Sequence, residues 1–298
     1  MPMIQTIQTT QASQATQTAT LTQPVTLEGV GLITGLPLKA TLEKPATQSG
    51  ITFYLPDGSV IPAIADTVVN TFRGVTLASP TGKTLSIVEH LLSACAMANV
   101  RHLDVRLQGQ GDIAPELPLL DGSALPWFEV LAPFSDGAPE TVFELASTLV
   151  HTDPEDPDVE IVAVPSDTLK LTYLMNFDHP GLKQKWYTYI EATDGPLGTA
   201  IAPARTFGFV RELPALQAQG LAKGVSLDNT LGLTDEGGYT AELRLPDEPL
   251  RHKVLDLIGD LMLCGVPITG IRAHIVARNA GHTSHMAFGK QLAQQMTQ

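Results

Sequence analysis

Residues 251–261, RHKVLDLIGDL, place three side chains capable of chemistry at intervals of four: His252, Asp256 and Asp260. Residues four apart on an α-helix share a face, so this spacing sets one imidazole and two carboxylates in a single column. The leucines and the isoleucine between them fall on the opposite side, at the spacing of a core stripe. The column is therefore either an ordinary solvated helix face or half of a metal site.

A second helical pattern covers residues 83–100, KTLSIVEHLLSACAMANV, where apolar residues recur at helical spacing. Ser86 is a candidate N-cap for this helix, and Glu89, three residues later, fits the capping-box position. His90 follows directly, so the same segment offers a carboxylate and an imidazole side by side. Taken alone, the pair has a plain alternative, in which Glu89 caps the helix and His90 faces solvent.

Together the two helices could complete a metal site. A catalytic zinc site has three protein ligands and one open position. His252 and Asp256 offer two ligands from one helix, and His90 is a candidate for the third. Glu89 would then lie close to a water activated by the metal, where a general base is needed. Two imidazoles and one carboxylate also suit iron(II), so the ligand types alone leave the metal open.

Two loops add further polar residues. Residues 115–127, PELPLLDGSALPW, contain an Asp-Gly-Ser sequence whose simplest interpretation is a turn between strands. Residues 279–289, NAGHTSHMAFG, present His282 directly after a glycine, in what we interpret as a loop. His285, three residues later, receives no role in this interpretation.

The remaining patterns predict short strands separated by glycine and proline, together with few helices. Strands are expected in LPLKATLEK, GITFYLP, RHLDVRLQG and IRAHIVA, and a further helix over residues 251–264. In each half a helix leads through a tight turn into a strand, and the polar cluster lies on that helix. We therefore expect an α+β fold of two domains of similar topology, residues 23–138 and 139–298, with helices layered on small mixed sheets.

The composition narrows the class of protein. Of 298 residues, 43% are hydrophobic and 16% charged, as in a globular protein, and the net charge of −13 argues against nucleic-acid binding. Residues 1–22 are rich in Gln and Thr and predict a disordered tail. The first basic residue is Lys39, so we expect no signal peptide, and no apolar run is long enough to span a membrane. Cys95 and Cys264 lie in apolar patterns and predict buried, reduced thiols, which favours the cytoplasm.

The stretches SIVEHLLSA, PELPLLDGSA, ARTFGF, RHKVLDLIGDL and AGHTSHMAF occur in this order. With them the chain resembles the UDP-3-O-acyl-N-acetylglucosamine deacetylases, zinc amidases of lipid A synthesis in Gram-negative-type bacteria, from about Thr26 to near the C-terminus. The resemblance implies an active site between two similar domains. It also implies zinc-dependent hydrolysis of the N-acetyl amide of a UDP-linked acylated amino sugar, which releases acetate in the committed step of lipid A biosynthesis. We expect a cytoplasmic monomer.

The same resemblance implies a role for each candidate residue. The zinc ligands would be His90, His252 and Asp256, which completes the set of three considered above. Glu89 would be the general base for the attacking water.

Further roles follow from the resemblance for residues outside the ligand set. His282 would act as the cationic acid, and Asp260 would orient its imidazole. Thr206 would help to stabilise the tetrahedral oxyanion. Phe207 would pack against the sugar, and Lys253 would meet the polar groups of a diphosphate-bearing substrate.

The resemblance also implies an insert at residues 205–231 that builds an apolar passage for the acyl chain. Its apolar residues are equally compatible with an ordinary core, namely Phe209, Val210, Leu213, Leu216, Leu221 and Val225. One departure from the family pattern is Ile33 in GLITG, where the family usually has histidine. Two other functions stay open: an amidase acting on another acylated sugar, and a non-enzymatic relic of the fold that binds a ligand or partner.

Overall fold

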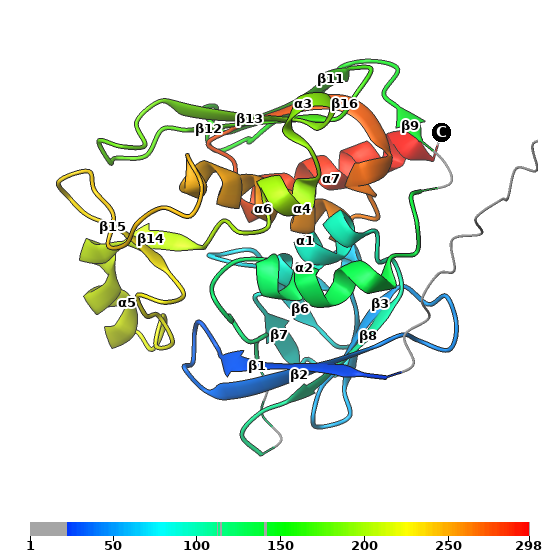
Figure 1. The fold of residues 1–298 in the computed structure, drawn as a ribbon, viewed down its shortest axis with the longest axis vertical. Coiled ribbons are helices and arrows are strands. Elements are labelled where there is room, and N and C mark those ends of the chain that lie inside the picture. The colour runs from blue at the N-terminus through cyan, green and yellow to red at the C-terminus, as the bar shows by residue number, and fades with distance from the viewer. Residues whose placement is uncertain (1–22, 112, 114, 140–141, 298) are drawn as a thin grey trace, which may run out of the picture.

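A computed structural model describes residues 23–111, 113, 115–139 and 142–297 (Figure 1). The predicted tail, residues 1–22, lies outside the described residues. Two sheets form the outer layers of the molecule, and the longer helices lie between them (Figure 1). Within the described ranges, no helix combines the length and the apolarity needed to cross a membrane.

The first sheet has five strands in the order β1-β2-β8-β3-β4. Their bounds are β1 (Val25–Val30), β2 (Pro37–Glu43), β3 (Ile51–Tyr54), β4 (Val60–Pro62) and β8 (Leu103–Gln108). Neighbouring strands are antiparallel except β3 and β8, which run parallel. Alternate residues of β2 and β8 are buried, as expected for a sheet with one face against a core.

The second sheet repeats this arrangement. Its strand order is β10-β11-β16-β12-β13, with β9 pairing to β16 outside this path. The bounds are β9 (Phe143–Glu144), β10 (Leu149–Thr152), β11 (Glu160–Pro165), β12 (Lys170–Met175), β13 (Lys185–Ile190) and β16 (Ile271–Arg278). The pair β12–β16 is parallel and the other pairs along the path are antiparallel, as in the first sheet. The predicted α+β fold with two units of similar topology is thus confirmed, whereas the position of the domain boundary stays a prediction.

The inner helices occupy matching places in the two halves. Helix α1 (Glu89–Ala98) precedes β8 and α2 (Leu125–Leu131) follows it, while α6 (Glu248–Leu263) precedes β16 and α7 (His282–Met296) follows it. Helices α1 and α6 pack directly against each other. Both cysteines are free thiols, and Cys95 on α1 is buried as predicted, whereas Cys264 is only half-buried.

The remaining elements are smaller than these. A three-stranded sheet comprises β5 (Val68–Asn70), β6 (Thr76–Ala78) and β7 (Thr84–Ser86). The region predicted as an insert holds β14 (Phe207–Phe209), α5 (Leu213–Ala218) and β15 (Leu231–Leu233), and it projects from one side of the molecule (Figure 1). The remaining helical turns are α3 (Glu191–Asp194), α4 (Leu197–Ala200), η1 (Ala65–Thr67), η2 (Ala132–Phe134), η3 (Val210–Glu212) and η4 (Ile268–Gly270).

The helix predicted over residues 83–100 is shorter than expected, and its predicted capping box is wrong. Residues Thr84–Ser86 form β7 and pair with β6, so the Ser86 hydroxyl contacts Thr76 at 2.8 Å and caps no helix. Ile87 then takes a left-handed φ of 60°, which is unusual for a β-branched residue, and its N–H donates to the Val75 carbonyl. Helix α1 begins only at Glu89, whose carboxylate is therefore free of a capping role.

Candidate active site

The polar column on α6 is buried, so the solvated-face alternative is excluded. The exposed fractions of His252, Asp256 and Asp260 are 3%, 4% and 0%. The helix is thus covered on this side as well, by the first turn of α1. A Cβ added to Gly259 would lie 2.3 Å from the Glu89 carbonyl oxygen, so only glycine permits this close approach of the two helices.

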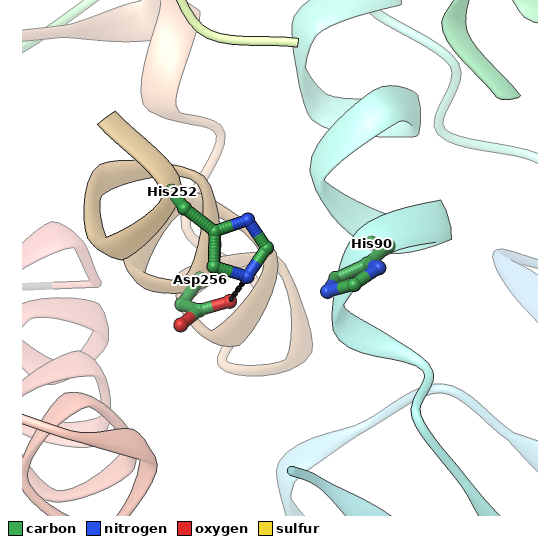
Figure 2. A group of neighbouring side chains, drawn as sticks. All are labelled: His90, His252 and Asp256. Carbon is green, nitrogen blue, oxygen red and sulfur yellow. Dashed lines mark ion pairs between the residues drawn. The ribbon is translucent and has the colours of Figure 1, made fainter. Parts of the chain in front are cut away.

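The three predicted ligands come together at this contact. Figure 2 shows His90 on α1 facing His252 and Asp256 on α6. One donor atom from each residue lies within 4.8 Å of the other two, and His252 Nε2 is 3.4 Å from Asp256 Oδ1. The two imidazole rings stand edge to face, with centroids 5.0 Å apart.

The protonation states of the group suit a cation. Burial lowers the pKa of His90 to about 3, assisted by the charge of His252, and burial likewise lowers the pKa of His252 although Asp256 opposes it. His252 donates its Nδ1–H to the Ala204 carbonyl at 3.0 Å, so its Nε2 keeps a lone pair on the side of the cluster. Although burial opposes its charge, Lys253 and the imidazoles hold the pKa of Asp256 well below its usual range. Two neutral imidazoles and one carboxylate are the forms that bind metals.

Glu89 lies next to this group but in a different environment. It is 3% exposed, and burial raises its pKa to about 7, with the charge of His282 opposing and those of Asp256 and Asp260 adding to the rise. Its Oε2 accepts a hydrogen bond from the Val75 N–H at 3.1 Å. A carboxyl group with a pKa near neutrality can both take up and release a proton.

His282 is the first residue of α7, and it lines a cavity that Glu89 and the three candidate ligands also line. Its Nδ1 donates to Asp260 Oδ2 at 2.8 Å, and its Nε2 is 4.0 Å from Glu89 Oε1. Burial disfavours the charged ring, but the charge and hydrogen bond of Asp260 outweigh it and raise the pKa of His282 to about 9. The ring is therefore an imidazolium at neutral pH.

The loop before β14 closes another side of the site. Thr206 and Phe207 both line the cavity, and Phe207 stands edge to face with His252 at a centroid distance of 6.0 Å. The Thr206 N–H donates to the carbonyl of Gly122, in the Asp-Gly-Ser turn of residues 121–123, at 2.7 Å. Lys253 also lines the cavity, and its Nζ is 2.7 Å from Asp256 Oδ2.

A buried ion pair holds this loop against α6. Arg205 Nε donates to Glu248 Oε1 at 2.8 Å, and the side chains are 6% and 0% exposed. Glu248 also accepts from the backbone N–H groups of Arg205 and Arg244. The loop that carries Thr206 and the helix that carries His252 are therefore fixed to each other.

A single cavity of about 650 Å³ joins the polar cluster to the insert. All six apolar insert residues named above line it, namely Phe209, Val210, Leu213, Leu216, Leu221 and Val225. None of the six is fully buried, so they form a cavity wall and not the ordinary core that was the alternative. The cavity thus has a polar end, where the first turn of α1 faces His252 and Asp256 of α6, and an apolar wall.

Comparison with known proteins assigns the chain to a family. Residues 18–294 match the family profile described as LpxC, UDP-3-O-acyl N-acetylglycosamine deacetylase. The chain belongs to this family. A UDP-3-O-acyl-N-acetylglucosamine deacetylase of Leptospira biflexa is 37% identical over 93% of this chain and 90% of the relative. Proteins of the same name from Synechocystis and Chlamydia felis are 37% and 34% identical, over 92% and 93% of this chain and 98% and 97% of theirs.

Ile33, the departure from the LpxC family pattern, lies at the cavity. Its side chain contributes to the lining. Its backbone N–H donates to Glu116 Oε2 at 2.8 Å, and the N–H and hydroxyl of Thr34 donate to Glu116 Oε1 at 2.8 and 2.6 Å. A buried carboxylate therefore holds the GLITG turn, and at this position the cavity wall is apolar instead of offering an imidazole.

The residues expected from the sequence and the family resemblance lie together in the structure, and one further histidine contacts them. All nine predicted site residues lie at or directly beside the cavity, with Asp260 reaching it through His282. His285 was assigned no role, yet its Nδ1 is 2.8 Å from Asp260 Oδ2. The signal was a helix start: residue 282 begins α7, so residues 282 and 285 share a face.

Proposed function

We propose that the protein hydrolyses the N-acetyl amide of UDP-3-O-acyl-N-acetylglucosamine in a zinc-dependent reaction of lipid A synthesis. The observation that carries this proposal is the cavity itself. A buried cluster of metal-binding type lies beside one carboxyl group of raised pKa and one imidazolium, and an apolar wall continues from it. Family membership and the names of the relatives support the substrate.

His90, His252 and Asp256 would hold the zinc ion. Their donor set of two nitrogens and one oxygen is the kind found in catalytic zinc sites, which keep a further position open. When bound, zinc supplies Lewis-acid polarisation of the amide carbonyl and lowers the pKa of water to near 7. The hydrogen bond from His252 to Ala204 fixes the tautomer that such a ligand needs.

Glu89 and His282 would carry the protons. Glu89 takes a proton from the water whose oxygen attacks the carbonyl carbon. His282 gives its Nε2 proton to the amide nitrogen as the carbon–nitrogen bond breaks, so that acetic acid and a neutral amine leave. The acid then loses its proton to solvent at neutral pH and becomes acetate. Glu89 Oε1 and His282 Nε2 are 4.0 Å apart, so the proton would return from the carboxyl group to the imidazole through one bridging water after each cycle.

The other predicted residues would bind the substrate. The Thr206 hydroxyl would donate to the developing oxyanion, and Phe207 would pack against the sugar ring. Lys253 would offer positive charge to the diphosphate, although its ammonium group is already bonded to Asp256, which also suits a role in keeping that ligand ionised. The apolar wall around Leu216 would take the acyl chain.

The test measures metal content and deacetylation on one purified sample, before and after chelation. We expect about one zinc ion per chain, since the described residues offer one cavity-lining ligand cluster. Turnover should disappear on chelation and return when zinc is added. A chain that binds zinc but leaves the acylated UDP-sugar intact would contradict the substrate, and a panel of UDP-sugars with and without the acyl chain would then identify another. If the purified protein contained no metal and showed no turnover, that result would favour a non-enzymatic relic of the fold.

A further inference from the structure

A second histidine lies behind His282. His285 Nδ1 is 2.8 Å from Asp260 Oδ2, the same oxygen atom that lies 2.8 Å from His282 Nδ1. The two rings stand nearly perpendicular, with centroids 6.0 Å apart. His282 lines the cavity, whereas His285 is 0% exposed and does not. Because His285 cannot touch a molecule in the cavity, any part that it plays in the reaction passes through Asp260.

The contacts of His285 define its tautomer. Burial lowers the pKa of His285 although Asp260 opposes this, so the ring is neutral near pH 7. An ionised carboxylate only accepts hydrogen bonds, so the single N–H of the ring lies on Nδ1 and points at Asp260. The lone pair on Nε2 then faces the Tyr173 hydroxyl at 3.0 Å. The single hydrogen of this hydroxyl is shared between that lone pair and the Ala280 carbonyl, at the start of the turn into α7.

Asp260 is therefore held from two sides. In the part of the chain that the structure describes, its hydrogen-bond donors are these two rings, and both use Oδ2. Its other oxygen, Oδ1, is buried without a hydrogen-bond partner among the described residues. With one donor the carboxylate could rotate toward either oxygen, whereas two donors on one oxygen fix its direction.

We propose that His285 is a positioning residue for His282. It holds the Asp260 carboxylate in the orientation that receives His282 Nδ1–H. Because the ring is neutral, it shares the oxygen without placing a second positive charge beside His282. Its hydrogen bond also withdraws part of the negative charge that favours the His282 imidazolium. This inference rests on the proposed function, in which His282 gives a proton to the leaving amine. Besides Asp260, the titratable groups around the pair in the described part of the chain include Glu89 and His90 from α1, His252, Lys253 and Asp256 from α6, and Tyr173 from β12.

The test compares two substitutions, His285→Leu and His285→Asn. The leucine removes the donor, so we expect kcat to fall about 10- to 100-fold, as for other residues that orient a catalytic group through a hydrogen bond. KM should stay within about threefold, because His285 does not reach the cavity. The alkaline limb of the pH profile should move to higher pH, because Asp260 then acts on His282 with its full charge. Asparagine keeps an N–H donor and should restore part of kcat and of the limb.

The matched control is His274→Asn. His274 lies on β16, bonds to the Thr172 hydroxyl at 2.8 Å and does not line the cavity, so kcat and the pH profile should stay unchanged. Metal content and the thermal unfolding midpoint are measured for each variant. Wild-type kcat and an unmoved alkaline limb in His285→Leu would overturn the proposal. So would equal losses in the leucine and asparagine variants with lowered unfolding midpoints and no movement of the limb, because that pattern describes a purely structural residue.

A spectroscopic readout separates this inference from the proposed function. Nitrogen NMR of ring-labelled histidine in the wild-type protein should show the His285 proton on Nδ1, the minor tautomer of free histidine in water. This measurement needs no turnover. A protein that deacetylates the substrate but carries the His285 proton on Nε2 would overturn the inference alone. A protein with the expected tautomer but no turnover on acylated UDP-sugar would support the hydrogen-bond arrangement and contradict the proposed function.

Discussion

Replacing Asp260 by asparagine tests whether a buried negative charge keeps His282 protonated. Asp260 is 0% exposed, so solvent does not screen its interaction with the imidazole. The pKa of His282 is raised from 6.5 to about 9 even though burial pulls it down. At 1.36 kcal/mol per pKa unit, this rise corresponds to roughly 3 kcal/mol in favour of the imidazolium.

Without the charge, burial should bring the pKa of His282 to its ordinary value of 6.5 or below, since Asp256 and Glu89 exert the weaker attractions. At pH 8, such a ring is protonated in roughly one molecule in thirty, against about nine in ten when the pKa is 9. The rate at pH 8 should therefore fall roughly 30-fold, whereas at pH 6 the difference in protonation is less than about twofold. The direction of the pH dependence follows from the role of His282 as an acid that must be protonated. Activity is present below the pKa of His282 and is lost as the pH rises through it.

The assay is kcat for deacetylation between pH 5.5 and about 9.5, with zinc content and the thermal unfolding midpoint measured in parallel. A bound cation lowers the pKa of His282 in the wild type and in Asp260→Asn alike, so the difference between the two pKa values stays. The matched control is Asp57→Asn, in the turn between β3 and β4, whose carboxylate binds the Ser59 N–H away from the cavity. A loss of equal size at every pH, or an alkaline limb that stays at the wild-type position, would refute the electrostatic role of Asp260.

Three further substitutions probe the base, the helix contact and the apolar wall. Glu89→Gln should lower kcat by about 10²- to 10⁴-fold while zinc content stays at the wild-type level, because Glu89 holds no ligand position; near-normal turnover would contradict its role. Gly259→Ala should reduce the free energy of unfolding in urea and weaken zinc binding, because its Cβ meets the Glu89 carbonyl at 2.3 Å and forces α1 away from α6; an unchanged zinc affinity would show that the ligand cluster tolerates this separation. Leu216→Trp should raise KM for long-chain substrates more than for short-chain ones, and an equal effect on both would place the acyl chain elsewhere.

Helical spacing alone could predict that His252 and Asp256 share one face. That His90 joins them was a possibility from the sequence pattern and was implied in full only by the family resemblance. The burial of this ligand cluster could not be predicted, because it depends on α1 packing over the same face. The contact requires Gly259, and a glycine inside a helical pattern has no single local interpretation. The carbonyl of Ala204, which fixes the His252 tautomer, lies 48 residues away in the chain and carries no side-chain signature.

The two local errors have related causes. Residues 84–86 are compatible with a helix, but pairing with β6 outweighs that preference, and the left-handed turn at Ile87 is imposed by tertiary contacts. The second error is the loop predicted over residues 279–289. There α7 begins directly after Gly281, whose N–H donates to the Ser284 hydroxyl at 3.0 Å. A hydroxyl three residues after a possible N-cap is a helix-start signal. Recognising it would have put His282 and His285 on one face.

The environments of three carboxylates distinguish their roles within one small volume. Asp256 has Lys253 at 2.7 Å and a low pKa, as a metal ligand requires. Although burial opposes its charge, Asp260 is held ionised by the charge of His282 and by hydrogen bonds from His282 and His285. Burial raises the pKa of Glu89 to about 7, because its carboxylate bonds to the neutral Val75 N–H and has no bonded cation to offset burial, with His282 Nε2 4.0 Å away. Three residues of the same chemical type thus differ in pKa because different cations lie beside them. The carboxylate without a bonded cation is the one suited to move a proton.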